Sequence, residues 1–208
     1  MENIEGIIFD LDGTLWSAVE ACCGAWDEVL SEHKDIKRRI TVKDMEGCMG
    51  LQIPDIGKKL FPELSYEYRM QLMNECCSRE QSYLTIHGGK LFPKVEDTLK
   101  KLAEKYKLFV VSNCQDGYIE CFFKAHGLGK YFTDIECSGK TGLSKGENNK
   151  LIMKRNNIKN AVYVGDAFVD EESADVAEIP FVYARYGFGS VTKYDYVIDK
   201  FEDLLKIF

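Results

Sequence analysis

Two aspartates, Asp10 and Asp12, lie two residues apart directly after the apolar run 7–9. A short continuous apolar run is typical of a buried strand in a parallel sheet. Ligands of open α/β sheets bind beyond the carboxyl ends of such strands. Gly13 allows the chain to turn sharply at this point, but Asp and Gly are also ordinary residues of turns without a function. The pair by itself therefore indicates either a site or a simple turn.

Further polar residues occupy comparable places later in the chain, namely Ser112 with Asn113, Asp166 with Asp170, and Lys145. The serine and Asp166 each end an apolar run, and the lysine begins a segment with helical spacing. Because the strand ends of one parallel sheet share an edge, these groups can converge although they are far apart in the sequence.

Converging carboxylates repel one another unless they are protonated or bridged by a cation. A set of oxygen ligands without His or Cys suits Mg²⁺, which usually also binds a phosphate. A serine, a lysine and backbone amides can hold the remaining phosphate oxygens. One carboxylate can then act as the nucleophile and form an aspartyl-phosphate, while a second acts as general acid and then base.

The elements that must position these residues alternate between strands and helices from about residue 86 onward, which indicates a parallel sheet covered on both faces. Between residues 16 and 85 the apolar residues have helical spacing throughout. Ser17 with Glu20 has the form of a capping box for the first of four helical segments. We therefore expect a doubly wound α/β core domain of residues 1–15 and 86–208, with an inserted all-helical cap domain of residues 16–85.

These motifs, taken in order, resemble the four motifs of the haloacid dehalogenase (HAD) superfamily. They are Asp10-Leu-Asp-Gly-Thr14, Ser112, Lys145, and Gly165-Asp166 with Asp170. The helical block resembles the four-helix cap of that superfamily, so the resemblance covers nearly the whole chain. It implies a Rossmann-like core and a place in the phosphoglycolate phosphatase-like or β-phosphoglucomutase-like subgroup.

The resemblance also implies a role for each residue. Asp10 would be the nucleophile and a Mg²⁺ ligand, and Asp12 the acid and base, with its backbone carbonyl facing the metal. Asp166 would ligate Mg²⁺, and Asp170 would support it directly or through water. The phosphate group would be held by Asp10, the backbone amides of Leu11 and Asp12, the loop residue Thr14, Ser112, Asn113 and Lys145.

Several positions have competitors or open alternatives. Lys140 competes with Lys145, and the acidic residues that follow Asp170, of which Glu171 is the first, compete with it. Trp16 can be packing at the junction of core and cap or a wall of the pocket. Gly47 and Gly50 form either a substrate-facing loop or a break between helices.

Composition excludes several classes of function. The net charge of −7 makes nucleic acid an unfavourable partner. No apolar run approaches the roughly 20 residues needed to cross a membrane, and the first residues lack the pattern of a signal peptide. The eight cysteines have no Cys-x-x-Cys spacing. We expect free thiols in a cytoplasmic protein that is a monomer or a weak homodimer.

The leading prediction is a Mg²⁺-dependent phosphatase that acts on a small phosphorylated metabolite. Asp12 argues against dehalogenase chemistry, which needs no acid for a leaving group. A β-phosphoglucomutase-like sugar-phosphate mutase uses the same motifs and is the nearest alternative. A non-catalytic phosphate-binding protein is the alternative from another class. The cap should set substrate specificity, because the core motifs address only the phosphoryl group.

Overall fold

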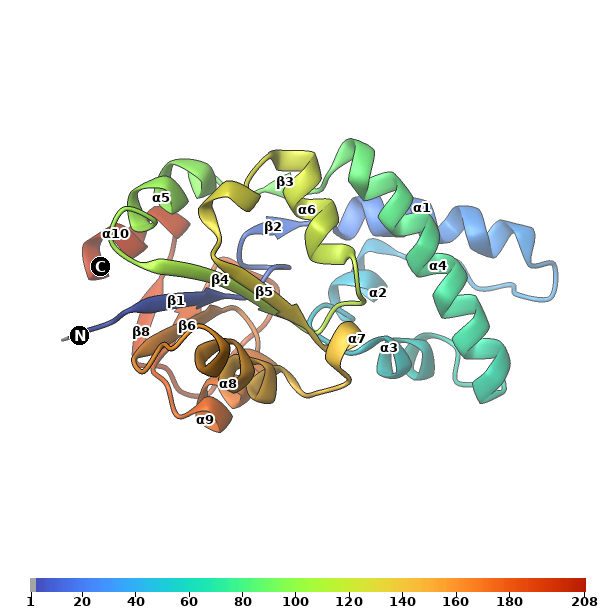
Figure 1. The fold of residues 1–208 in the computed structure, drawn as a ribbon. Coiled ribbons are helices and arrows are strands. Elements are labelled where there is room, and N and C mark those ends of the chain that lie inside the picture. Colours follow the sequence, from blue (N-terminus) through green and yellow to red (C-terminus); the bar gives the residue numbers. More distant parts are fainter. Residues whose placement is uncertain (1–2) are drawn as a thin grey trace.

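The computed structural model describes residues 3–208, and its central element is a six-stranded parallel sheet (Figure 1). The strand order is β5-β4-β1-β6-β7-β8. The strands are β1 (Gly6–Phe9), β4 (Lys107–Ser112), β5 (Asp134–Cys137), β6 (Ala161–Gly165), β7 (Phe181–Ala184) and β8 (Tyr196–Ile198). The doubly wound α/β core predicted from the sequence is confirmed.

Strand β1 lies between β4 and β6, and the three strands end at the same edge of the sheet. Phe9 is level with Val110 of β4 on one side and with Val164 of β6 on the other. The backbone amide of Asp10 continues the ladder by donating to the Val164 carbonyl at 2.8 Å. The residues that follow these strands are therefore neighbours in space.

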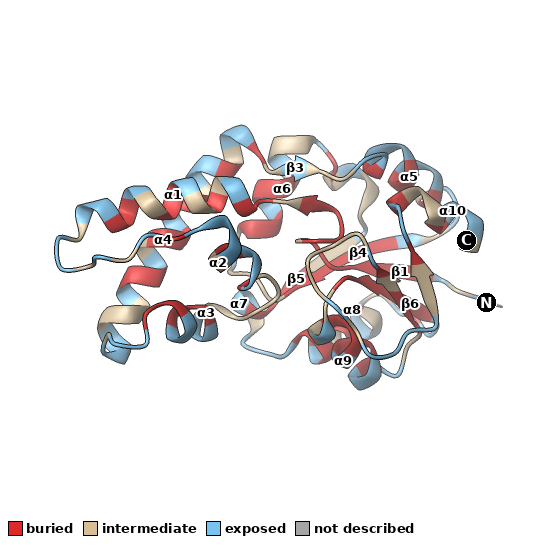
Figure 2. Ribbon diagram, turned by 180° about the vertical axis from the view of Figure 1, so that it is seen from behind, coloured by how far each residue is buried: buried red, intermediate tan, exposed pale blue. Residues whose placement is uncertain are grey.

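Helices cover both faces of the sheet (Figure 1). Helices α8 (Lys145–Arg155) and α9 (Phe168–Ala177) pack on the face that contains Ile8, Phe109 and Tyr163. The other face is covered by α5 (Val95–Leu102), α6 (Tyr118–His126) and α10 (Leu204–Ile207). Because strand residues are buried on both faces, as Figure 2 shows, these strands read as continuous apolar runs in the sequence.

Four helices lie in the inserted region: α1 (Val19–Glu32), α2 (Val42–Glu46), α3 (Ile53–Leu60) and α4 (Tyr66–His87). A short antiparallel ribbon of β2 (Trp16–Ser17) and β3 (Lys90–Leu91) brackets them. The predicted capping box at the start of α1 is wrong. Ser17 lies in β2, and the N-cap of α1 is Ala18, which makes no side-chain cap. Ser17 instead pairs with Lys90, and a pairing with a distant strand has no local signature in the sequence.

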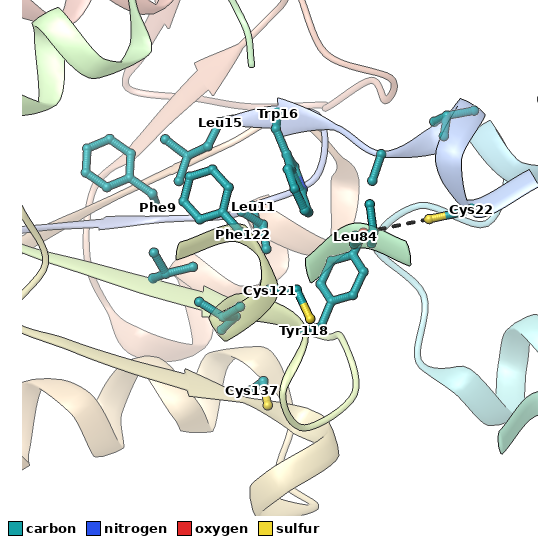
Figure 3. Close-up of a cluster of buried hydrophobic side chains, with 14 of the residues drawn as sticks. Phe9, Leu11, Leu15, Trp16, Cys22, Leu84, Tyr118, Cys121, Phe122 and Cys137 are labelled. Carbon is teal, nitrogen blue, oxygen red and sulfur yellow. Dashed lines mark hydrogen bonds between the residues drawn. The ribbon is translucent and has the colours of Figure 1, made fainter. Parts of the chain in front are cut away.

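Trp16 is a packing residue at the junction of the two regions. Its side chain is fully buried, and its ring lies edge-on to the rings of Tyr118 and Phe122, with centroids 5.7 and 5.1 Å away (Figure 3). These contacts hold the ribbon against α6. The structure therefore favours the hinge-packing interpretation of Trp16.

Helix α4 is the longest helix of the inserted region and continues to His87, two residues past the expected end of the cap domain. The remaining short elements are α7 (Ser138–Thr141), η1 (Gly129–Tyr131) and η2 (Phe201–Asp203). The eight cysteines are free thiols. Within residues 3–208, no helix combines the length and the apolar character needed to cross a membrane.

Candidate active site

Three carboxylates converge at the carboxyl edge of the sheet. Asp10 follows β1, Asp166 follows β6, and Asp170 lies in the first turn of α9. One carboxylate oxygen from each lies within 4.8 Å of the others, and all three side chains are buried. The two strand ends and one helix start that were separate in the sequence thus form one cluster.

Lys145, the first residue of α8, lies between two of these carboxylates. Its Nζ donates to Asp10 Oδ1 at 2.8 Å and to Asp170 Oδ1 at 2.7 Å. Although burial opposes the charged form, the two carboxylates raise the pKa of Lys145 above its ordinary value. The competitor, Lys140, has a half-exposed side chain and lies 4.0 Å from Glu136 instead. Lys145 is therefore the lysine of the cluster.

Asp170 uses both carboxylate oxygens to organise its neighbours. Its Oδ2 accepts hydrogen bonds from the backbone amides of Asp166 and Ala167, each at 2.9 Å, and its Oδ1 accepts from Lys145. Its competitor Glu171 points elsewhere and accepts from the backbone amide and the hydroxyl of Thr192. Asp170 therefore holds Asp166 and Lys145 in place.

Asp166 faces the turn after β1. Its Oδ2 accepts from the backbone amides of Phe188 and Gly189 at 2.7 and 3.2 Å. Gly13 has a φ of +86°, and a Cβ there would lie 2.3 Å from Asp166 Oδ2. Glycine is thus required at this position both by the backbone conformation and by the approach of the carboxylate.

Electrostatics in the cluster favour a bound cation. Burial, followed by the charge of Asp170, raises the pKa of Asp10 to about 6 despite Lys145. Burial and the charges of Asp170 and Asp10 likewise raise the pKa of Asp166. The donors are all oxygen atoms, which is the ligand type that Mg²⁺ prefers. Asp10, Asp166 and Asp170 each bring a carboxylate oxygen to the cluster, so the cluster fits such an ion.

Asp12 is not part of the acidic cluster, and its side chain contacts α6. Its Oδ1 accepts a hydrogen bond from the Tyr118 hydroxyl at 3.1 Å. Burial and the charge of Asp10 raise the pKa of Asp12 to about 8, although the Tyr118 bond acts in the other direction. Burial therefore favours the protonated form of this side chain.

Two of the predicted phosphate-binding residues, Ser112 and Asn113, line the same cavity as Asp10. Ser112 ends β4, and its Oγ accepts from the Cys114 backbone amide at 3.4 Å. The Asn113 side chain is engaged elsewhere, because it donates to the Gly50 carbonyl and accepts from the Ser138 hydroxyl, both at 2.8 Å.

Leu11 and Thr14 belong to the tight turn that carries the two aspartates. The Leu11 carbonyl accepts from the backbone amide of Leu15 at 2.9 Å, and the Thr14 carbonyl accepts from the Tyr186 hydroxyl at 2.8 Å. The Leu11 backbone amide faces the Asp10 carboxylate and acts to lower the pKa of Asp10. These contacts hold the turn in a shape that presents both carboxylates.

A cavity of about 50 Å³ lies between this edge of the sheet and the inserted helices. Asp10, Asp12 and Ser112 form its floor, and Gly50 is part of its wall. Most of the remaining lining is apolar, from Cys22, Trp26, Met45, Cys48, Met49, Leu51, Ile53 and Ile56. The inserted helices thus enclose the space directly above the nucleophile candidate.

The sequence did not indicate several side chains of this cavity, among them Glu80 of α4 and Tyr118 of α6. Glu80 is 4% exposed and accepts from Trp26 Nε1 at 2.5 Å and from Gln115 Nε2 at 2.9 Å. Burial raises the pKa of Glu80. Glu80 is one charged residue in a helix with many, so its burial has no local signal.

The fold and the cluster define a class of α/β enzymes with an acidic centre at the carboxyl edge of the sheet, beneath inserted helices. The family model described as haloacid dehalogenase-like hydrolase matches residues 7–184, and the chain belongs to this family. The resemblance of the four motifs is thereby confirmed.

Individual relatives are more distant. A phosphoglycolate phosphatase of Salmonella paratyphi A is 24% identical over 235 residues, covering 99% of this chain and 92% of that protein. A haloacid dehalogenase-like hydrolase of Streptococcus pneumoniae superposes with a TM-score of 0.86 at 21% identity, covering 100% and 99% of the two chains. A β-phosphoglucomutase of Clostridium difficile superposes with a TM-score of 0.78 at 19% identity, covering 97% and 93%. At these identities the solved structures establish the fold alone.

Proposed function

We propose that this protein is a Mg²⁺-dependent phosphatase that hydrolyses a small phosphorylated metabolite through an aspartyl-phosphate on Asp10. The observation that carries the proposal is the position of Asp10, between Lys145 at 2.8 Å and the carboxylate of Asp166, on the floor of an enclosed cavity. The phosphoglycolate phosphatases among its relatives support a phosphate ester as the substrate.

In the first step, an oxygen of Asp10 forms a bond to phosphorus, and the bond from phosphorus to the leaving oxygen breaks. Asp12 gives its proton to that oxygen, so the product leaves as an alcohol. In the second step, water attacks phosphorus and Asp12 takes a proton from it. The bond to Asp10 breaks, inorganic phosphate is released, and both aspartates return to their starting states.

The phosphoryl oxygens are held by Ser112, by Lys145 and by the backbone amides of Leu11 and Asp12. We assign the contact of Asn113 to its backbone amide, because its side chain already binds Gly50 and Ser138. Thr14 acts through the shape of the turn, which its carbonyl stabilises through Tyr186.

The Mg²⁺ ligands would be a carboxylate oxygen of Asp10, the backbone carbonyl of Asp12 and a carboxylate oxygen of Asp166. Asp170 would act from outside this set, because its oxygens already accept from Lys145 and from two backbone amides. An ion held by these residues would supply neutralisation of the charge on the phosphoryl group.

The core domain in this proposal comprises residues 1–15 and 86–208, and the cap domain residues 16–85. The ribbon of β2 and β3 then forms the connection between them. The eight free thiols support a reducing compartment such as the cytoplasm. We also propose a monomer or weak homodimer.

The test is phosphate release from a panel of phosphate esters, with Mg²⁺ and with EDTA. We expect turnover that requires the ion and is abolished in Asp10→Asn, because an amide is a far poorer nucleophile. Asp97→Asn, whose side chain is exposed on α5, is the matched control. If Asp10→Asn keeps most of the activity, the assignment of Asp10 as the nucleophile is contradicted. Isomerised sugar phosphate without phosphate release would instead identify a mutase, and no turnover on any ester a binding protein.

A further inference from the structure

The cavity above Asp10 contains no cation that could pair with an acidic leaving group. None of the lining side chains, all within residues 3–208, is Lys, Arg or His. The site's cation, Lys145, is committed to Asp10 and Asp170 in the core. Any charge on the leaving group would therefore meet only the inserted helices, the loop after β4 and α6, none of which places a cationic side chain in the lining.

Three cations of the inserted region donate to backbone carbonyls, and none of them lines the cavity. Arg38 donates to the Leu60 carbonyl at 2.7 Å, and Arg69 donates to the Leu64 carbonyl at 3.2 Å. Lys59, which is exposed, donates to the Gly47 carbonyl. None of these three side chains lines the cavity.

The polar group that the inserted helices do present is an acid. Glu80 lines the cavity and is held there by Trp26 and Gln115, whose N–H groups both donate to its carboxylate. Two N–H donors are the partners that a carboxylate requires when it is buried. Glu80 therefore places acceptor oxygens, and no compensating positive charge, next to the space for the leaving group.

We propose that the leaving group of the substrate is a small, uncharged alcohol, and that Glu80 excludes esters whose leaving group is anionic. This inference rests on the proposed phosphatase function and specifies its substrate class. A carboxylate on the leaving group would lose its hydrating water in this cavity without gaining a cation as a partner. It would also lie near Glu80. The apolar lining and the volume of about 50 Å³ favour a short carbon chain instead. Phosphoglycolate, whose leaving group carries a carboxylate, is then a poor substrate.

The test compares phosphoglycolate with its amide, phosphoglycolamide, which has nearly the same shape and an uncharged leaving group. Propyl phosphate is the apolar member of the series. We expect kcat/KM for both uncharged esters to exceed that for phosphoglycolate by about 100-fold, since an unpaired buried charge is strongly disfavoured. In Glu80→Gln this ratio should fall at least tenfold. In Glu67→Gln, an exposed position on the same helix, the ratio should not change.

The outcomes separate this inference from the proposed function. If no ester of the series or of the wider panel is hydrolysed, the phosphatase function fails. If phosphoglycolate is hydrolysed at least as well as its amide, the protein is a phosphatase and the inference is overturned. If the wild type prefers esters with an uncharged leaving group, a folded Glu80→Gln variant then tests the cause. If the variant keeps this preference in full, the role of Glu80 is refuted. Folding of that variant is checked by circular dichroism.

Discussion

Replacing Lys145 by methionine tests the electrostatic arrangement of the cluster without depending on any substrate. Lys145 Nζ lies 2.8 Å from Asp10 and 2.7 Å from Asp170, and its side chain is 3% exposed. Methionine keeps most of the length of the side chain but removes the charge. Breaking a buried ion pair by removing one partner costs about 3–5 kcal/mol, because the other charge stays buried and unpaired. We expect a loss of this size in the free energy of unfolding at alkaline pH.

The loss should depend on pH, because the charge of Lys145 acts to lower the pKa of Asp10, and removing it raises that pKa further above about 6. A carboxyl whose folded pKa lies above its unfolded value, about 3.9, binds its proton more tightly in the folded state. The resulting stability is present at low pH and is lost as pH rises through the folded pKa. The free energies of unfolding of wild type and variant therefore differ least near pH 5.5. Above pH 6 they diverge by up to about 1.4 kcal/mol per pH unit.

Urea denaturation followed by the fluorescence of Trp16 and Trp26, both buried, measures this difference at pH 5.5 and 8.5 in EDTA. Lys140→Met removes an exposed lysine and should change stability by less than about 0.5 kcal/mol. An equal loss at both pH values, or a loss below about 1 kcal/mol at pH 8.5, would refute the electrostatic reasoning.

Two further predictions concern Asp12 and the metal. Tyr118→Phe removes the hydrogen bond that stabilises the Asp12 carboxylate, so the pKa of Asp12 should rise from about 8. The alkaline fall of kcat, where Asp12 loses the proton it donates, should then move up by about one pH unit. The surface control Tyr66→Phe should leave the pH profile of kcat unchanged. An unchanged profile in Tyr118→Phe would argue against Asp12 as the acid. Asp166→Ala should raise the Mg²⁺ concentration for half-maximal activity about tenfold or more, and an unchanged titration would exclude Asp166 as a ligand.

Particular features of the fold could be predicted because their signals are local. The helical spacing between residues 16 and 85 predicts four helical segments, and the structure has four helices there. Thr41 forms the capping box of α2 with Asp44, and Ser144 caps α8. The two-residue strands β2 and β3 could not be predicted, because they are defined only by pairing with each other.

The sequence by itself determined which residue types follow each strand, and therefore the chemistry open to this protein. Two aspartates after the first strand, a serine at the end of a later strand, and an acid after another strand indicate that these side chains converge, because parallel strands share one edge. Only the tertiary structure decided which of two lysines reaches Asp10 and that Asn113 contacts Gly50. It also decided that Glu80 enters the cavity. Such contacts depend on how whole helices pack, and residues far apart in the chain carry no local record of that packing.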